Sequence, residues 1–261
     1  MLHWLIGAAC GALIGVTLGL VGGGGSILAM PLIIHVMGVS STHVAIGTAA
    51  VAVTANALAN LALIGRRGLI KWRCVIVFAS SGVVGAAVGA ALGKLMNGAH
   101  LQFLFGLLMI VVGALMFRSR NASGDEQVRL DRTSAPYLLP RLLGLGFATG
   151  AMSGFFGIGG GFLIVPGLIL ATDMPMIMAV ASSLVAITAF GLTTSVSYAL
   201  SGLVDWPLAG VFILGGVLGG VLGGRFARHL ASKKDLLARV FAVVVAIVGA
   251  YVCVTSWSGA S

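Results

Sequence analysis

The sequence "GLVGGGGSILAMP" at residues 19–31 places four consecutive glycines, Gly22 to Gly25, inside a long apolar stretch. A glycine inside a helix costs about 1 kcal/mol relative to alanine, so four in a row are expected to interrupt any helix. A helix that is interrupted inside a bilayer must find new partners for the backbone groups that the break frees. The stretch therefore predicts a helix break, and the backbone groups that the break exposes are expected to serve a function.

The composition identifies an integral membrane protein. The chain has 261 residues, of which 59% are hydrophobic and 8% charged, whereas soluble chains carry about 25% charged residues. Most of its apolar segments reach the roughly 20 residues that a spanning helix needs. The three cysteines have no metal-binding spacing, and no metal or cofactor is expected. The apolar segments lie at 2–21, 25–38, 43–65, 74–96, 101–117, 138–156, 160–172, 176–200, 206–224 and 236–257.

The glycine motif occurs twice, because "GFFGIGGGFLIVP" at 154–166 matches the first motif at an offset of 135 residues. Further pairs recur at nearly the same spacing, among them "GLIKW" with "GLVDW" and "IVVGA" with "AIVGA". We expect two repeats, at 1–117 and 138–261, joined by a polar linker at 118–137 within one membrane domain. Because the first residues correspond to residues in the middle of the chain, they are expected to be structural rather than a signal peptide.

Equivalent loops of the two repeats differ in positive charge. Four basic residues lie at 66–73, and the counterpart near 201–207 has none. The next loop reverses this, with only Lys94 in the first repeat and five basic residues at 225–239. If each repeat crosses the membrane an odd number of times, every Lys and Arg except Lys94 lies on one side, which the positive-inside rule makes cytoplasmic. The pattern predicts inverted repeats, a cytoplasmic linker and both termini outside.

Segments 2–38 and 138–172 are each expected to form a re-entrant helical hairpin. The piece after the first glycines, 25–38, would rise about 20 Å as a helix, whereas the hydrocarbon core is about 30 Å thick. Each hairpin would turn at its Gly-rich tip and leave by the side from which it entered, one from each face. The tips would then meet near the midplane. Each repeat is thus predicted to be one hairpin plus three transmembrane helices.

The two glycine tips predict an anion site. Glycine permits a tight turn with exposed backbone, and the helix after each tip presents free N–H groups and a positive dipole end. Inverted repeats with broken helices around a central site are typical of secondary transporters. No strand precedes the motif and no GK[ST] ends it, which excludes a nucleotide loop. Gly82, Gly85, Gly89 and their equivalents are instead interpreted as helix-packing positions.

Polar residues on the long helices after the hairpins are expected to complete the site. Thr48 and Ser182 are equivalent at an offset of 134, and we expect both hydroxyls to donate hydrogen bonds to the anion. Asn56 and Asn60 lie one turn apart on one face, and at least one is expected to line the cavity. The predicted substrate-binding residues are Gly22, Gly23, Gly24, Gly25, Ser26, Thr48, Asn56, Asn60, Gly157, Gly159, Gly160, Gly161, Ser182 and Ser183.

Two other functions fit parts of the sequence. One is an intramembrane serine hydrolase in which Ser26 is the nucleophile and His35 or His43 the base; it leaves the second glycine motif unexplained. The other is a membrane assembly factor that transports nothing. The two histidines have no counterparts in the second repeat. They are interpreted as interfacial residues, with proton coupling as the alternative.

The paired motifs "GLVGGGGSILAMP" and "GFFGIGGGFLIVP", with "AIGT" at 45–48, resemble the TauE/SafE family of sulfite-exporter-like permeases over nearly the whole chain. "AVASS" at 179–183 departs from the "AIGT" pattern. The resemblance implies a secondary transporter, an exporter or permease rather than an enzyme, in the inner (plasma) membrane. It also implies a small anion as substrate, such as sulfite, an organosulfonate or a carboxylate. Its partners would be this anion, the lipid bilayer and a coupling proton or cation, without nucleic acid.

Overall fold

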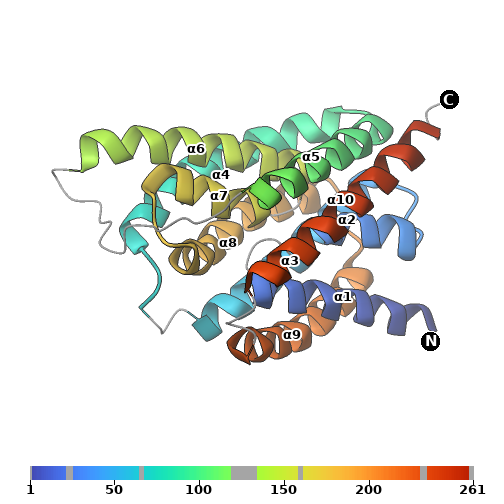
Figure 1. Cartoon of the computed structure of the whole chain (residues 1–261). Coiled ribbons are helices and arrows are strands. Elements are labelled where there is room, and N and C mark those ends of the chain that lie inside the picture. The colour runs from blue at the N-terminus through green and yellow to red at the C-terminus, as the bar shows by residue number, and fades with distance from the viewer. Residues whose placement is uncertain are drawn as a thin grey trace.

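The computed structural model describes residues 2–21, 26–64, 68–118, 134–157, 161–229 and 234–258, and every element within these ranges is helical (Figure 1). This confirms the predicted all-α class for the described residues. The first half contains α1 (Leu2–Val21), α2 (Ala29–Pro31), the π-helix η2 (Leu32–Val36), α3 (Thr42–Ile64), α4 (Trp72–Leu95) and α5 (Gly98–Arg118). The second half contains α6 (Ala135–Phe156), α7 (Gly161–Thr172), α8 (Met176–Leu200), α9 (Trp206–His229) and α10 (Lys234–Ser258).

The helices follow the apolar segments. The hydrocarbon core offers no water to the backbone N–H and C=O groups, so an apolar segment crosses it as a helix, in which these groups bond to one another. Among the described residues, four helical stretches are long and apolar enough to cross a membrane. Polar or special residues set some of the ends: Asp205 accepts a hydrogen bond from the N–H of Leu208 at 3.1 Å and so caps α9. The chain is therefore a polytopic membrane protein. The four stretches are Thr42–Ala62, Trp72–Leu95, Met176–Leu200 and Trp206–Gly223.

The helices of the two halves pack against one another rather than each half by itself. Helix α1 lies along α9, and α6 lies along α4 (Figure 1). The two pairs are equivalent under the sequence repeat, since α6 corresponds to α1 and α4 to α9. In the centre α3 crosses α8, and at one side α5 packs against α10. Each half therefore depends on the other for its packing.

Glycines bring the backbones of these pairs into direct contact. A Cβ on Gly11 of α1 would lie 2.6 Å from the carbonyl oxygen of Phe212, and the equivalent Gly146 of α6 would meet that of Phe78 at 2.5 Å. Gly85 and Gly89 of α4 would likewise press on the backbone of α6. Small residues at such spacing are what lets membrane helices approach closely. The interpretation of Gly82, Gly85 and Gly89 as packing positions is therefore confirmed.

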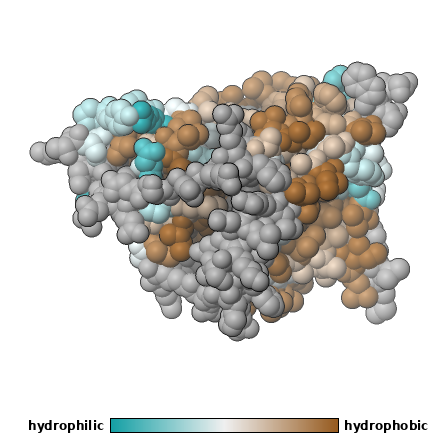
Figure 2. Space-filling view, viewed as in Figure 1, coloured by the Kyte–Doolittle hydropathy of each residue, from teal (hydrophilic) through white to brown (hydrophobic). Residues whose placement is uncertain are grey.

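The outward faces of the helices are hydrophobic. Figure 2 shows apolar side chains over most of the coloured part of the visible face, with hydrophilic groups gathered toward its left and right ends. On α4 the exposed positions Ile76, Val84, Val88 and Leu92 recur along one side of the helix. A soluble protein rarely exposes an apolar patch of such length, so these side chains belong against lipid.

Helix α6 of the second hairpin extends along α4 as far as its last turn. The carbonyl oxygen of Phe155, at the end of α6, lies 2.5 Å from where a Cβ on Gly93 would be, and Gly93 is in the last turn of α4. Because α6 and α4 run in the same direction, the 22-residue α6 is as deep as the spanning helix beside it. The second tip therefore lies level with the end of α4, and its expected position near the midplane of the membrane stays a prediction.

Candidate functional site

The second glycine tip is a sharp turn in the left-handed region of the backbone. Gly157 ends α6 with φ 63°, and its N–H donates to the carbonyl oxygens of Gly154 and Ser153. Glycine is favoured at a position with positive φ, because the backbone of a residue with a side chain is strained there. Helix α7 then begins at Gly161, which is buried. Gly159, Gly160 and the first tip, Gly22 to Gly25, lie outside the described residues.

The second tip packs against the other half of the protein. A Cβ on Gly157 would collide with the side chain of Ile46, which belongs to the "AIGT" segment at the start of α3. Glycine is thus required at position 157 for two reasons, the positive φ angle and the close approach of Ile46. The tip and α3 come from different repeats, so movement between the halves changes this contact directly.

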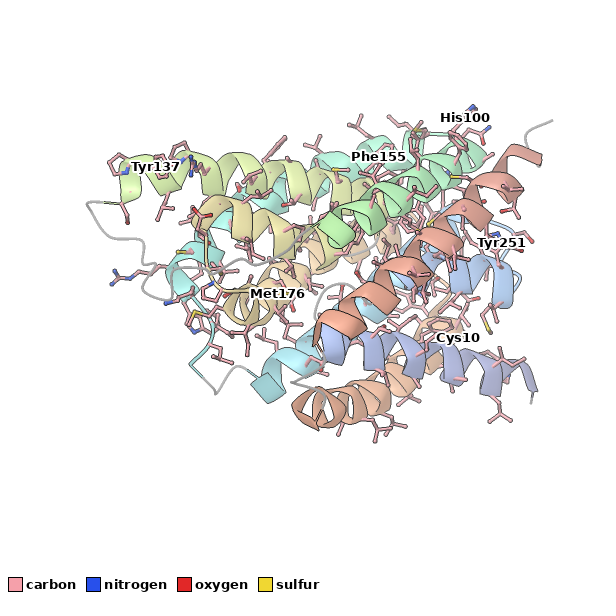
Figure 3. All side chains as sticks on the ribbon, in the orientation of Figure 1. Cys10, His100, Tyr137, Phe155, Met176 and Tyr251 are labelled. Carbon is pink, nitrogen blue, oxygen red and sulfur yellow. The ribbon has the colours of Figure 1, made fainter. Side chains whose placement is uncertain are left out.

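Aromatic and aliphatic side chains surround the tip. The rings of Phe156 and Phe105 have centroids 5.7 Å apart, and Phe155, labelled in Figure 3, lies edge-on to Phe156. One buried cluster contains Phe156 and Phe162, which flank the second tip, together with residues that follow the first tip, Ile27, Leu28 and Met30. The segments next to the two tips therefore share one apolar core, in which polar groups stand out.

Four buried polar atoms have no hydrogen-bond partner in the described part of the chain. They are Nδ1 of His43, Oδ1 of Asn56, Oγ of Ser153 and the hydroxyl of Tyr198. Ser153 and Tyr198 are both fully buried, and Ser153 lies one turn before the tip at Gly157. Buried polar groups are nearly always paired in folded proteins, so each of these atoms needs an explanation.

Thr48 and Ser182 are both engaged with the opposite half. The hydroxyl of Thr48 accepts a hydrogen bond from the N–H of Asp205 at 2.9 Å, and that of Ser182 accepts one from the N–H of Lys71 at 3.1 Å. The two bonds are equivalent under the repeat. On α3, Thr48 lies about 160° around the helix from Ile46, so it does not face the second tip. These hydroxyls connect the halves instead of converging on one point.

The predicted asparagines lie against α9. Asn60 donates from Nδ2 to the carbonyl oxygen of Asn56 at 2.9 Å, and a Cβ on Gly216 or Gly220 would collide with the Asn56 or Asn60 amide. Asn56 is ten residues from Ile46, which is about 15 Å along α3. The structure therefore does not bring the asparagines to the second tip.

Two further predicted serines, Ser26 and Ser183, are buried. Ser183 donates to the carbonyl oxygen of Val180 at 2.8 Å, within its own helix. Ser26 is fully buried at the start of the segment that returns from the first tip. Of the predicted set, the residues that the structure brings together at one described tip are Gly157 and Gly161.

His35 binds groups other than Ser26. Its Nδ1 lies 3.2 Å from the carbonyl oxygen of Pro31, and its Nε2 lies 3.3 Å from Oγ1 of Thr255 on α10. Its ring also contacts that of Tyr251, which Figure 3 labels on α10. With both nitrogens engaged in this way, His35 is not positioned as a base for Ser26. This geometry disfavours the hydrolase that pairs these two residues.

Sequence reasoning missed Lys94 and Tyr198. Lys94 donates to the carbonyl oxygen and hydroxyl of Ser197 at 3.2 and 3.0 Å and to the hydroxyl of Ser201 at 3.0 Å. Its ammonium also lies 5.8 Å from the centre of the Tyr198 ring. A signal for Lys94 existed, because it was the one basic residue that the predicted topology placed apart from the others.

Comparison with known proteins identifies the family of this chain. The family model described as "Sulfite exporter TauE/SafE" matches residues 7–252. A "Probable membrane transporter protein" of Xylella fastidiosa (strain 9a5c) is 47% identical over 248 residues, covering 95% of this chain and 94% of that protein. The "Probable membrane transporter protein YunE" of Bacillus subtilis (strain 168) is 27% identical over 265 residues, covering 95% and 96%. The chain therefore belongs to the TauE/SafE sulfite exporter family of membrane transporters.

Proposed function

We propose that this protein is a secondary transporter of a small oxyanion, such as sulfite, an organosulfonate or a related carboxylate, in the plasma membrane. The observation that carries the proposal is the second tip, where the glycine turn before α7 packs against Ile46 in α3 of the other half. A helix N-terminus offers backbone N–H groups and a partial positive charge to an anion. The buried, unpartnered hydroxyl of Ser153 one turn away supports the same location.

The chemistry of this location favours an anion of modest size. The cluster that surrounds the tip is apolar, so N–H and O–H groups are the donors on offer. Such donors bind oxygens of sulfur-containing or carboxylate groups by charge-assisted hydrogen bonds. The repeat implies a related arrangement at the first tip, Gly22 to Gly25.

We propose that transport proceeds by alternating access between inverted repeats. The equivalent bonds Thr48–Asp205 and Ser182–Lys71 each join a long helix of one half to the loop before a helix of the other. Breaking one bond while keeping the other would open one side of the protein alone. With the predicted topology, both termini face outward and the Thr48 bond lies on the outer side.

Uptake into proteoliposomes tests the function. Purified protein reconstituted at defined orientation is expected to carry radiolabelled sulfite or an organosulfonate, with competition from unlabelled anions giving the order of preference. A protein whose sole role is membrane assembly would carry none of them. The same assay with Gly157→Val, which blocks the turn, is expected to show loss of flux. Flux that survives in well-folded Gly157→Val protein would refute the location of the site.

A further inference from the structure

Tyr198 is a buried phenol whose hydroxyl has no partner in the described part of the chain. Its side chain is fully buried near the end of α8, and the O–H is among the unpaired buried atoms. Buried tyrosines usually direct this group to a hydrogen-bond partner. The corresponding residue of the first repeat is Ile64, so the phenol occurs in the second repeat without a counterpart in the first. An O–H without a partner is a donor available to a ligand.

The surroundings of Tyr198 connect it to the second tip. Its Cβ lies 3.0 Å from where a Cβ on Gly47 would be, and the neighbouring residue Ile46 is the one that packs on Gly157. Tyr198 also shares a buried cluster with Ile46 and with Phe156 and Phe162, which flank the tip. The phenol therefore lies in the same core as the turn, on its α8 side.

A positively charged side chain, that of Lys94, lies beside the Tyr198 ring. The ammonium of Lys94 lies within cation–π distance of the Tyr198 ring. The three hydrogen bonds that it donates within the described part of the chain go to uncharged groups of Ser197 and Ser201. No carboxylate pairs with it among the described residues. The C-terminal end of α8 offsets about half a charge, so the Lys94 ammonium leaves part of its positive charge beside the Tyr198 ring.

We propose that Tyr198 is a substrate-selecting residue, which donates its phenol hydrogen to an oxygen of the anion at the second tip. Lys94 holds the ring in place and supplies the positive potential without touching the anion, because its own hydrogens are already used. This inference rests on the proposed function and adds to it a residue and a ligand chemistry. A sulfonate or sulfite oxygen accepts such a hydrogen bond, whereas a halide offers no comparable directional acceptor.

Replacement of Tyr198 by phenylalanine tests the proposal with little change of shape. Tyr198→Phe is expected to weaken binding of sulfite or methanesulfonate to purified protein about tenfold or more, as loss of a charge-assisted hydrogen bond does. Tyr251→Phe makes the same chemical change at an exposed site on α10 and is expected to leave the affinity unchanged. Lys94→Met is expected to weaken binding as well, and Lys94→Arg to restore most of it.

Thermal unfolding without anion separates a ligand role from a structural one. A phenol with no internal partner contributes no hydrogen bond to the empty protein, so Tyr198→Phe is expected to melt at the wild-type temperature or higher. A lower melting temperature, or equal anion affinity in wild type and Tyr198→Phe, would overturn the inference and leave the proposed function intact. Wild-type protein that neither binds nor carries any of these anions would overturn both.

Discussion

Replacing Thr48 by valine removes one of the two equivalent hydrogen bonds between the halves. Valine has nearly the shape of threonine but cannot accept from the N–H of Asp205, which lies 2.9 Å from Oγ1 in the wild type. An unpaired buried N–H costs about 1–3 kcal/mol. Because Asp205 is only half-buried, water reaches the freed N–H. The free-energy cost of losing the bond is therefore near the lower end of this range, at about 1 kcal/mol. About 1 kcal/mol corresponds to a roughly fivefold shift of an equilibrium.

The equilibrium that shifts is the separation of α3 from the loop before α9. A cysteine at Leu203, whose carbonyl oxygen lies against Gly47 of α3, reports this separation through its rate of maleimide labelling. The three native cysteines are removed first. When closing is faster than labelling, the rate follows the open population, so Thr48→Val is expected to raise it about fivefold.

Two controls make the Thr48 result decisive. Thr48→Ser keeps the accepting hydroxyl and is expected to label at the wild-type rate. Ser182→Ala breaks the equivalent bond to Lys71 and is expected to leave labelling at Leu203 unchanged. Wild-type labelling in Thr48→Val would refute this reasoning. If anion affinity fell instead, Thr48 would be a substrate donor, as the sequence indicated.

Three further predictions concern topology, the tip and helix packing. A cysteine at Ser123 in the linker is expected to resist an impermeant maleimide in intact cells and to react after permeabilisation; ready labelling contradicts the inverted topology. Gly157→Ala is expected to destabilise the protein in detergent far more than Gly38→Ala, because both have positive φ but Gly38 has open space; equal melting temperatures contradict this. Gly89→Ala, which strikes Ala151, is expected to cost about 1–3 kcal/mol, whereas Gly210→Ala, with nothing within 4 Å, is expected to be neutral or stabilising, and thermal unfolding of both variants tests the difference.

Helix positions could be predicted from the sequence because hydrophobicity alone fixes them in a bilayer. The segment predicted at 176–200 is α8 to the residue, and that at 160–172 begins one residue before α7. Depth could not be predicted in the same way. The length of the return segment after a tip was taken as the depth of the whole hairpin, whereas α6 is long and α7 short. The contacts of Gly89 and Gly93 with Phe155 show how far α6 extends along α4.

The site was predictable in its glycines and not in its polar side chains. A glycine cluster in an apolar segment is visible in the sequence because it breaks a strong local preference. A hydroxyl on a helix carries no such signal, since it points to a ligand, a backbone carbonyl or another helix according to tertiary packing. Thr48 and Ser182 were correctly recognised as an equivalent pair, but their partners, the N–H groups of Asp205 and Lys71, follow from the way the halves interlock.

The packing of this protein obeys the repeat, whereas its unpaired buried polar groups do not. Phe190 fills the space over Gly82, and the equivalent residue Asn56 lies in the same way over Gly216. Backbone contacts through glycine fix the arrangement of the helices, so the interior side chains are free to differ between the halves without loss of the fold. The unpaired hydroxyls of Ser153 and Tyr198 stand where the first repeat has Leu18 and Ile64. At the second tip, which the proposed transporter would use as its anion site, the hydroxyls of Ser153 and Tyr198 would add donors that their equivalents in the first repeat lack, so that the two tips would differ in their affinity for the anion.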